Sequence, residues 1–513
     1  MKNLYSLSLF LVVLFSMVSV LPTFAAEPDY FTLTNTGTTN ATLYLKRAGG
    51  NNSNTLNIEW SINGGTWQDT RPYKYTNNTS ISIPAGQTIR FRGRNVKNNV
   101  YQFNSAGSLT SMIYWYMYSQ DSQFKASGDI MSLVAFDETS QTIKVEYPIG
   151  NGCFYSLFNY NSGSPSFTTL TDASELKLPS TPSNYCFVKM FDGCAKLTAV
   201  PTLSATTLGS YCYAYMFADC RALVNAPELP ATDITKYCYY GMFSRCVSLK
   251  TAPTLPATTL QEGCYAYMFQ NCSTLVNVQD TFPGTNLPKL CYQCMFDGCV
   301  DLKLAPEIMA AEDASVGQQC MDNMFANCTS LEKAPSVLRP KTLSGSSCVS
   351  HMFFKCTNLT KAPTIMATDI TGGNAADYMF GYCSKLNYMR IYRISFPSSI
   401  TGSNYWVTGV SQAGTIYCPP TLERVWTQTY SKMPYSSDYP WTIYSYDITF
   451  VPVGGSWADG TTENKRFTWE TDTTDVYSFL AAQVDEKSVS LIEGYYLNNV
   501  LSDATTESAI KND

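Results

Sequence analysis

Charged residues are scarce in this sequence. They make up 14% of its 513 residues, whereas an average soluble domain contains about 25%. The 34 Lys and Arg residues are outnumbered by 40 Asp and Glu residues, so the formal net charge is −6. A chain without a basic excess cannot neutralise many phosphates, and we therefore expect no nucleic acid partner.

Histidine is almost absent, which limits the chemistry available to the chain. His351 is the single histidine, and Ser–His or Cys–His catalysis would have to depend on it. It stands at a variable position of a repeated segment, which favours a surface residue over a catalytic one. Cys291-x-x-Cys294 is the single C-x-x-C motif and lacks the second pair that a zinc site of this kind needs. We predict no enzymatic activity, no metal site and no cofactor.

Long apolar runs are confined to the N-terminus. An apolar run from Leu7 to Leu21 follows a basic residue and leads to small residues before Ala25 and Ala26. This pattern is typical of a secretory signal peptide spanning residues 1–25. The first cysteine is Cys153, so none at the cleavage point can carry a lipid. No later stretch reaches 18 apolar residues, and we expect an exported chain, at the cell surface or extracellular, with no membrane insertion.

Internal repetition organises the middle of the chain. One segment recurs nine times, at steps of 33, 26, 26, 26, 27, 29, 28 and 27 residues between aligned phenylalanines. We number these copies units 1 to 9. Units 2 to 9 carry Met before the Phe and Cys three residues after it, while units 1 to 8 carry another Cys five residues before it. The aligned phenylalanines are Phe158, Phe191, Phe217, Phe243, Phe269, Phe296, Phe325, Phe353 and Phe380.

The spacing within one unit predicts a short helix and a short strand. The first Cys, the Met, the Phe and the second Cys stand at relative positions 0, 4, 5 and 8, which lie on one face of a helix. The following Leu-x-x-Ala-Pro part is too short for a helix and is interpreted as a brief strand. Such a unit cannot bury its apolar face alone, so we predict a solenoid of stacked units over residues 151–400. The expected fold class is α+β.

The flanking segments lack the repeat. Residues 26–150 alternate apolar and polar positions, as in Tyr30-Phe-Thr-Leu33, and predict a β-sandwich that covers the first unit. Residues 401–446 contain three tryptophans without repeat spacing and are interpreted as a C-terminal β cap. Residues 447–513 are expected to form a small β module and a tail.

The Met-Phe-x-x-Cys-x-x-Leu pattern of the units, as in Met216-Phe-Ala-Asp-Cys-Arg-Ala-Leu223, resembles the BspA-type leucine-rich repeats of bacterial surface proteins. The resemblance covers residues 153–399 and implies a secreted or cell-surface binding protein of a Bacteroidetes-like bacterium, commonly an adhesin. The expected partner is an extracellular protein, such as a host protein, or a glycan. The alternative is a structural or nutrient-capture component of a bacterial surface complex with no host ligand, and the sequence does not separate the two.

The cysteines allow two interpretations. Pairing the first Cys of each unit with the second Cys of the next unit uses all sixteen, and an exported chain can meet oxidising conditions. Buried free thiols are the alternative, because unbridged Cys is among the most buried residue types. The candidate inter-unit disulfides are Cys153–Cys194, Cys186–Cys220, Cys212–Cys246, Cys238–Cys272, Cys264–Cys299, Cys291–Cys328, Cys320–Cys356 and Cys348–Cys383.

Tyrosines recur around the first Cys of the units and should form columns when the units stack. Exposed columns of these rings suit stacking on sugars or anchoring a protein partner. The competing expectation is that at least half of them lie partly buried between neighbouring units. The candidate binding surface consists of Tyr185, Tyr211, Tyr213, Tyr215, Tyr237, Tyr239, Tyr265, Tyr267 and Tyr292.

Overall fold

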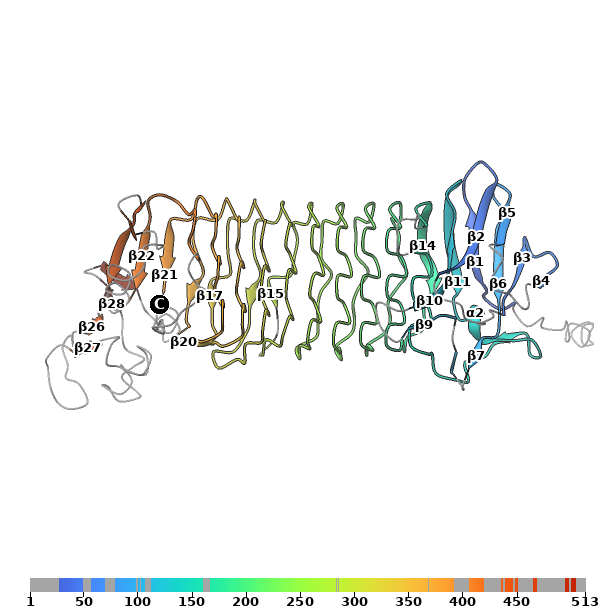
Figure 1. Ribbon diagram of the computed structural model, residues 1–513, viewed down its shortest axis with the longest axis horizontal. Helices are drawn as coiled ribbons and strands as arrows, with labels where there is room; N and C mark the ends of the chain where they lie inside the picture. The colour runs from blue at the N-terminus through green and yellow to red at the C-terminus, as the bar shows by residue number, and fades with distance from the viewer. Residues whose placement is uncertain are drawn as a thin grey trace, which may run out of the picture.

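The chain forms a long rod of stacked units with β-sheets at its N-terminal end (Figure 1). The expected signal peptide, residues 1–25, lies outside the described residues, as does most of the expected module 447–513. In this computed structural model the described residues are 27–48, 57–69, 79–97, 100–101, 103–106, 112–159, 167–282, 284, 286–367, 369–391, 406–418, 435–436, 439–445, 448–450, 465–467, 494–497 and 500–503.

Two sheets form the N-terminal end. One has the strand order β14-β11-β1-β6-β3-β4 and the other the order β5-β2-β10-β9. Alternation along β1 buries Phe31 and Leu33, which belong to the continuous core of the molecule. The strands are β1 (Phe31–Asn35), β2 (Ala41–Ala48), β3 (Glu59–Ile62), β4 (Gln68–Asp69), β5 (Thr79–Ile83), β6 (Thr88–Arg92), β7 (Val96–Lys97), β8 (Val100–Tyr101), β9 (Ser105–Ala106), β10 (Met112–Tyr118), β11 (Phe124–Asp129), β12 (Phe136–Asp137), β13 (Thr142–Ile143) and β14 (Leu170–Lys177).

Both N-terminal sheets continue into the repeats. β11 pairs in parallel with β14, which belongs to the first unit, and Asp172 of β14 bridges in parallel to Ala199 of the second. On the opposite side, the N–H of Met117 in β10 donates to the carbonyl of Leu157 at 2.7 Å. The backbone groups of the first unit are therefore paired on the side that faces the N-terminal sheets.

The segments that contain the two cysteines of each unit are not helical, so the α part of the predicted fold class is wrong for them. Among the described residues the helical element is α2 (Ser132–Ala135), which lies outside the repeats. In unit 3 the N–H of Ala214 donates to the carbonyl three residues back, on Tyr211, at 3.2 Å. The N–H of Tyr213 instead donates to Cys238 of the next unit at 2.9 Å. Alternate N–H groups thus close turns or join units, and we call this segment the turn ribbon.

A left-handed residue at every fourth position keeps the turn ribbon from becoming a helix. In unit 3 these residues are Tyr211, Tyr215 and Asp219, with φ of 55°, 56° and 54°. For residues with a Cβ this conformation costs about 1 kcal/mol or more. The hydrogen bonds to the next unit, made at every second residue, offset that cost because the same N–H groups would otherwise be left without partners.

Identical positions of successive units stack into a continuous core. The rings of Phe243 and Phe269 lie parallel at 5.7 Å, and both cysteine positions are fully buried. On the opposite side of the rod, single parallel bridges join Asn225 to Thr251 and Thr251 to Asn277. Longer pairs there are β15 (Thr281–Phe282) with β16 (Glu307–Ile308), β17 (Val337–Leu338) with β19 (Thr364–Ile365), and β18 (Thr342–Leu343) with β20 (Asp369–Ile370).

The strand ladder continues beyond the ninth unit, into the region where the sequence suggested a cap without repeats. Tyr388 pairs with Thr415 and Thr415 with Thr442, both in parallel and 27 residues apart. Trp406 packs on Phe380 with ring centroids 6.2 Å apart. The N–H of Phe380 donates to the carbonyl of Trp406 as that of Phe353 does to Met379, so Trp406 stands at the methionine position of a further unit. The remaining strands are β21 (Tyr388–Arg390), β22 (Thr415–Cys418), β23 (Tyr435–Ser436), β24 (Tyr439–Pro440), β25 (Thr442–Ser445), β26 (Ile448–Phe450), β27 (Lys465–Phe467), β28 (Gly494–Leu497) and β29 (Val500–Asp503).

Candidate binding surface

Four of the nine candidate tyrosines lie inside the rod. They follow the first Cys of units 3 to 6, and their rings stack in the core at 5.9–6.0 Å. Each is at most 2% exposed, so this column offers no surface and the expectation of exposed rings is wrong for it. The four residues are Tyr213, Tyr239, Tyr265 and Tyr292.

The other five candidates lie half-buried on the outer side of the turn ribbon. They join three tyrosines that sequence reasoning did not include: Tyr240 in unit 4, and Tyr44 and Tyr118 on β2 and β10. Tyr116 and Tyr155 lie buried within the same outer cluster. We call the following eight residues the tyrosine strip: Tyr44, Tyr118, Tyr185, Tyr211, Tyr215, Tyr237, Tyr240 and Tyr267.

Rings of the strip cover one another's faces. Tyr211 stacks on Tyr185 at 5.0 Å and on Tyr237 at 4.7 Å, with interplanar angles of 7° and 12°. At the N-terminal end Tyr118 stacks on Tyr44 at 4.9 Å, and Lys46 Nζ lies 5.2 Å from both ring centroids. Because these faces are occupied, the stacked part of the strip presents ring edges and hydroxyl groups to solvent.

Two glycines make room for the rings. A Cβ on Gly263 would come within 2.3 Å of the Tyr237 ring, and one on Gly241 within 2.5 Å of the Tyr215 ring. Both glycines have φ of 60°, so they also serve as left-handed positions of the turn ribbon. The Tyr240 ring stands nearly perpendicular to the Tyr215 ring at 5.2 Å. It also meets the Tyr237 ring edge-on at 5.8 Å, so the parallel stack does not extend onto Tyr240.

Charged groups border the strip in paired form. The hydroxyl of Tyr237 donates to Glu262 at 2.9 Å, and this bond holds the pKa of Glu262 below its usual value. Lys236 and Lys289 lie 3.2 and 3.5 Å from the same carboxylate. Two lysines share this single carboxylate, so the three groups together keep one net positive charge.

Asp192 is a largely enclosed carboxyl group beside unit 2. The amide of Asn159 donates to its Oδ2 at 2.9 Å. Burial raises the pKa of Asp192 to about 6, although Lys189 and that hydrogen bond oppose the shift. Asp192 therefore titrates between acidic and neutral pH.

Units 6 and 7 continue the same outer face with carboxylates held by amides. Asp297 accepts hydrogen bonds from Gln270 at 3.1 Å and from Asn327 at 2.8 Å. Asp322 accepts hydrogen bonds from Gln293 at 3.3 Å and Asn323 at 2.9 Å. Neither carboxylate has Lys or Arg within salt-bridge distance in the part of the chain that the structure describes.

The acidic stretch adjoins the end of the tyrosine strip. Burial is the main cause of the raised pKa of Tyr267, and the neighbouring Cys294 and Asp322 raise this pKa further. Burial also raises the pKa of the Cys294 thiol, and Asp297 and Asp322 raise it further. The outer face thus changes from aromatic to acidic between units 5 and 7.

The cysteines occupy the core without bridges. All 17 cysteines whose surroundings are described are buried and unbonded to one another, the candidate inter-unit pairs included. The thiol of Cys246 donates to the carbonyl of Phe217 in the preceding unit at 3.1 Å, and Cys220 does the same to Phe191 at 3.3 Å. Burial raises the pKa of Cys272 and Cys264 to about 12, which makes these thiols poor nucleophiles.

His351 lies on the outer face of unit 8. Its ring stacks on Tyr378 at 5.2 Å, and its Nδ1 lies 2.8 Å from Oγ of Ser350. Ser350 is only 4% exposed, so this pair offers no accessible nucleophile. Within the described residues no three His, Cys, Asp or Glu side chains are placed to hold a metal ion, and no helix has the length and apolarity to cross a bilayer.

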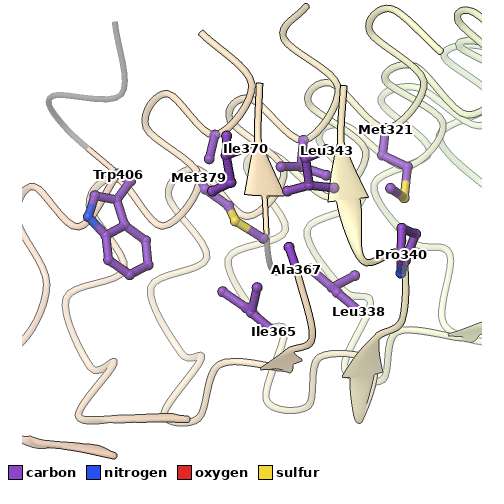
Figure 2. A pocket seen from close by; sticks show the side chains of 11 residues that line it. Met321, Leu338, Pro340, Leu343, Ile365, Ala367, Ile370, Met379 and Trp406 are labelled. Carbon is purple, nitrogen blue, oxygen red and sulfur yellow. The ribbon is translucent and has the colours of Figure 1, made fainter. Parts of the chain in front are cut away.

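An apolar cavity of about 30 Å³ lies in the core of units 7 to 9 (Figure 2). The residue after the first-Cys position shrinks from Tyr292 in unit 6 to Met321, Val349 and Ala376 in units 7 to 9, and the last three line the cavity. A space of this size holds about one water molecule. It is a packing gap between units and is too small for a ligand site.

Comparison with known proteins finds similarity among solved structures. No family model matches the chain, and no curated protein matches it. A leucine-rich repeat protein from Bacteroides ovatus of known structure is similar over 75% of this chain and 98% of its own, with 13% sequence identity and a TM-score of 0.30. A likeness at this level carries no conclusion about fold or function, so the assignment depends on the residues described above.

Proposed function

We propose that this chain is an exported leucine-rich-repeat-type binding protein of a bacterial surface, adhesin-like, and without catalytic activity. The tyrosine strip is the observation that supports this proposal. Tyrosine is among the residues that contribute most to binding energy at interfaces, because it combines a large apolar ring with a hydroxyl group. Its partner is an extracellular protein or a glycan, and the BspA-like repeat pattern supports the same role.

A binding screen tests this proposal. The purified chain without its first 25 residues is offered host matrix proteins, mucins and glycans, with binding measured by surface plasmon resonance. We expect a saturable partner whose affinity falls at least tenfold in Tyr185→Ala, Tyr211→Ala and Tyr237→Ala.

The screen has one control variant and one outcome that contradicts the proposal. Tyr382→Ala is the control, since this tyrosine is 46% exposed but lies in unit 9, away from the strip. Folded protein that binds no member of the panel would contradict the proposal and favour a structural or nutrient-capture component with a partner on the producing cell.

A further inference from the structure

The tyrosine strip presents an edge-on surface with a regular spacing. Its stacked rings lie 5.0 and 4.7 Å apart along Tyr185, Tyr211 and Tyr237, which is the separation of neighbouring strands. Tyr211 has both faces covered. A pyranose ring needs a free aromatic face to stack on, and Tyr211 does not offer one.

The spacing suits an extended peptide in the polyproline II conformation. Such a peptide completes a turn every three residues, over about 9.3 Å, so two ring steps correspond to one turn. Successive proline rings of the peptide can then pack against the ring edges of the strip. Proline-rich segments also bind to aromatic residues in other recognition modules, where these residues line a groove.

Hydroxyl groups of the strip can bind the backbone of this peptide. A polyproline II helix has no internal hydrogen bonds, so its carbonyls remain free to accept. In the described part of the chain the hydroxyls of Tyr185 and Tyr211 have no hydrogen-bond partner, and both are only half-buried. They are thus available as donors without breaking an existing bond.

Charge at one end of the strip adds a second requirement. Asp297 and Asp322 are held by neutral amides and have no Lys or Arg partner among the described residues. Backbone hydrogen bonds join this end to Tyr267, the last ring of the strip: its N–H donates to the carbonyl of Gln293 at 2.8 Å, and the N–H of the adjacent Cys294 donates to that of Asp322 at 2.9 Å. A basic side chain on the ligand would find carboxylates without a Lys or Arg partner there, next to the aromatic surface. Asp297 is half-buried and Asp322 is 8% exposed, so Asp297 makes the first contact.

We propose that the tyrosine strip binds a proline-rich peptide segment in the polyproline II conformation, with a basic residue of that segment placed against Asp297 and Asp322. This inference rests on the proposed binding function and names the partner class for it. The segment lies along the rod axis, across units 2 to 7, because both the ring steps and the aromatic-to-acidic change run in that direction.

Three labelled peptides test the proposal on the full exported chain by fluorescence anisotropy. They are an oligoproline of about ten residues, the same oligoproline with two added arginines, and a glycine-serine peptide of equal length with the two arginines. We expect saturable binding of the arginine-bearing oligoproline, several-fold weaker binding of plain oligoproline, and no binding of the glycine-serine peptide.

Variants separate the two parts of the site. Tyr211→Ala should weaken both oligoprolines at least tenfold, and Tyr211→Phe, which keeps the stack and removes the hydroxyl, about threefold. Asp297→Asn combined with Asp322→Asn should abolish the preference for arginine and leave plain oligoproline unchanged. Circular dichroism checks that each variant is folded, and Tyr382→Ala is the matched control.

The proposal is overturned if folded protein binds none of the peptides, if all three bind equally, or if Tyr382→Ala weakens binding as much as Tyr211→Ala. A glycan bound through the strip, with no peptide bound, would also overturn the peptide class while leaving the broader binding function intact. If the folded, unmodified chain binds neither glycans nor proteins, this result would instead count against the proposed function itself.

Discussion

At the residue scale, burial decides what the repeated side chains can do. Tyr213 and Tyr211 are two positions apart in one unit, yet the first is 2% exposed and the second half-buried. The left-handed conformation of Tyr211 directs its side chain away from the core that Tyr213 fills. Residue type alone does not distinguish a core tyrosine from a surface tyrosine, because both rings occur in stacked columns.

Asp192 gives the residue scale a pH-dependent prediction. Its pKa is about 6 in the folded chain and about 3.9 when unfolded, so the folded state binds more protons between these values. The Asp192 contribution is therefore most favourable below about pH 4 and is lost as the pH rises through 6, by about 2 to 3 kcal/mol. Asp192→Asn should raise the urea midpoint at neutral pH and leave it unchanged near pH 4.

The control for this prediction is Asp301→Asn, which replaces an exposed carboxylate of unit 6. It should shift the midpoint little at either pH. Equal midpoints of Asp192→Asn and the unmodified chain at neutral pH would show that Asp192 is solvated in the folded state.

At the element scale, the turn ribbon takes the place of the expected helix. An isolated unit would have to hold three left-handed residues without the hydrogen bonds that Tyr213 and its equivalents make to the next unit. The ribbon is consequently stable only in a stack, as expected for a repeat whose neighbours supply the interface energy. The same argument explains why positions 0, 4, 5 and 8 can face the core without a helical period.

Lys355 tests the left-handed column in unit 8. Its φ is 60° and its side chain is exposed above the Phe354 ring. Lys355→Val should lower the stability by about 1 to 2 kcal/mol relative to Lys355→Gly, because a β-branched residue is disfavoured at positive φ and glycine is not. Both variants lose the contact with Phe354, so comparing their denaturation midpoints isolates the backbone effect. Identical midpoints would contradict the assigned conformation.

At the scale of the whole molecule, the N-terminal sheets and the repeats share their hydrogen-bond ladders. β14 joins one sheet, and the Met117–Leu157 hydrogen bond joins the other. Two ladders of unpaired backbone groups would otherwise face solvent at the first unit, which is the usual cause of edge-to-edge association. The N-terminal sheets thus end the stack at one side.

Deletion of residues 27–149 from the exported chain should expose this edge. We expect the shortened chain to associate or aggregate at micromolar concentration, while the full chain under the same conditions does not change its mass. Light scattering coupled to size-exclusion chromatography measures the difference. A shortened chain with unchanged association and unchanged thermal midpoint would show that the first unit needs no cover.

The amino-acid sequence by itself determined the repeat: its period and its core positions in units 1 to 9 follow from spaced Cys, Met, Phe and Leu, which are recognisable because each of these units must fill the same core. It did not reveal that the ladder continues past unit 9, because Trp406 and Val407 stand there in place of the Met-Phe pair. Tertiary structure alone decided the path of the backbone between the cysteines, since the hydrogen bonds that stabilise left-handed residues come from the neighbouring unit. It also decided which tyrosines reach solvent and brought Tyr44, Tyr118 and Tyr240 to the others, because exposure depends on how units stack and not on local pattern.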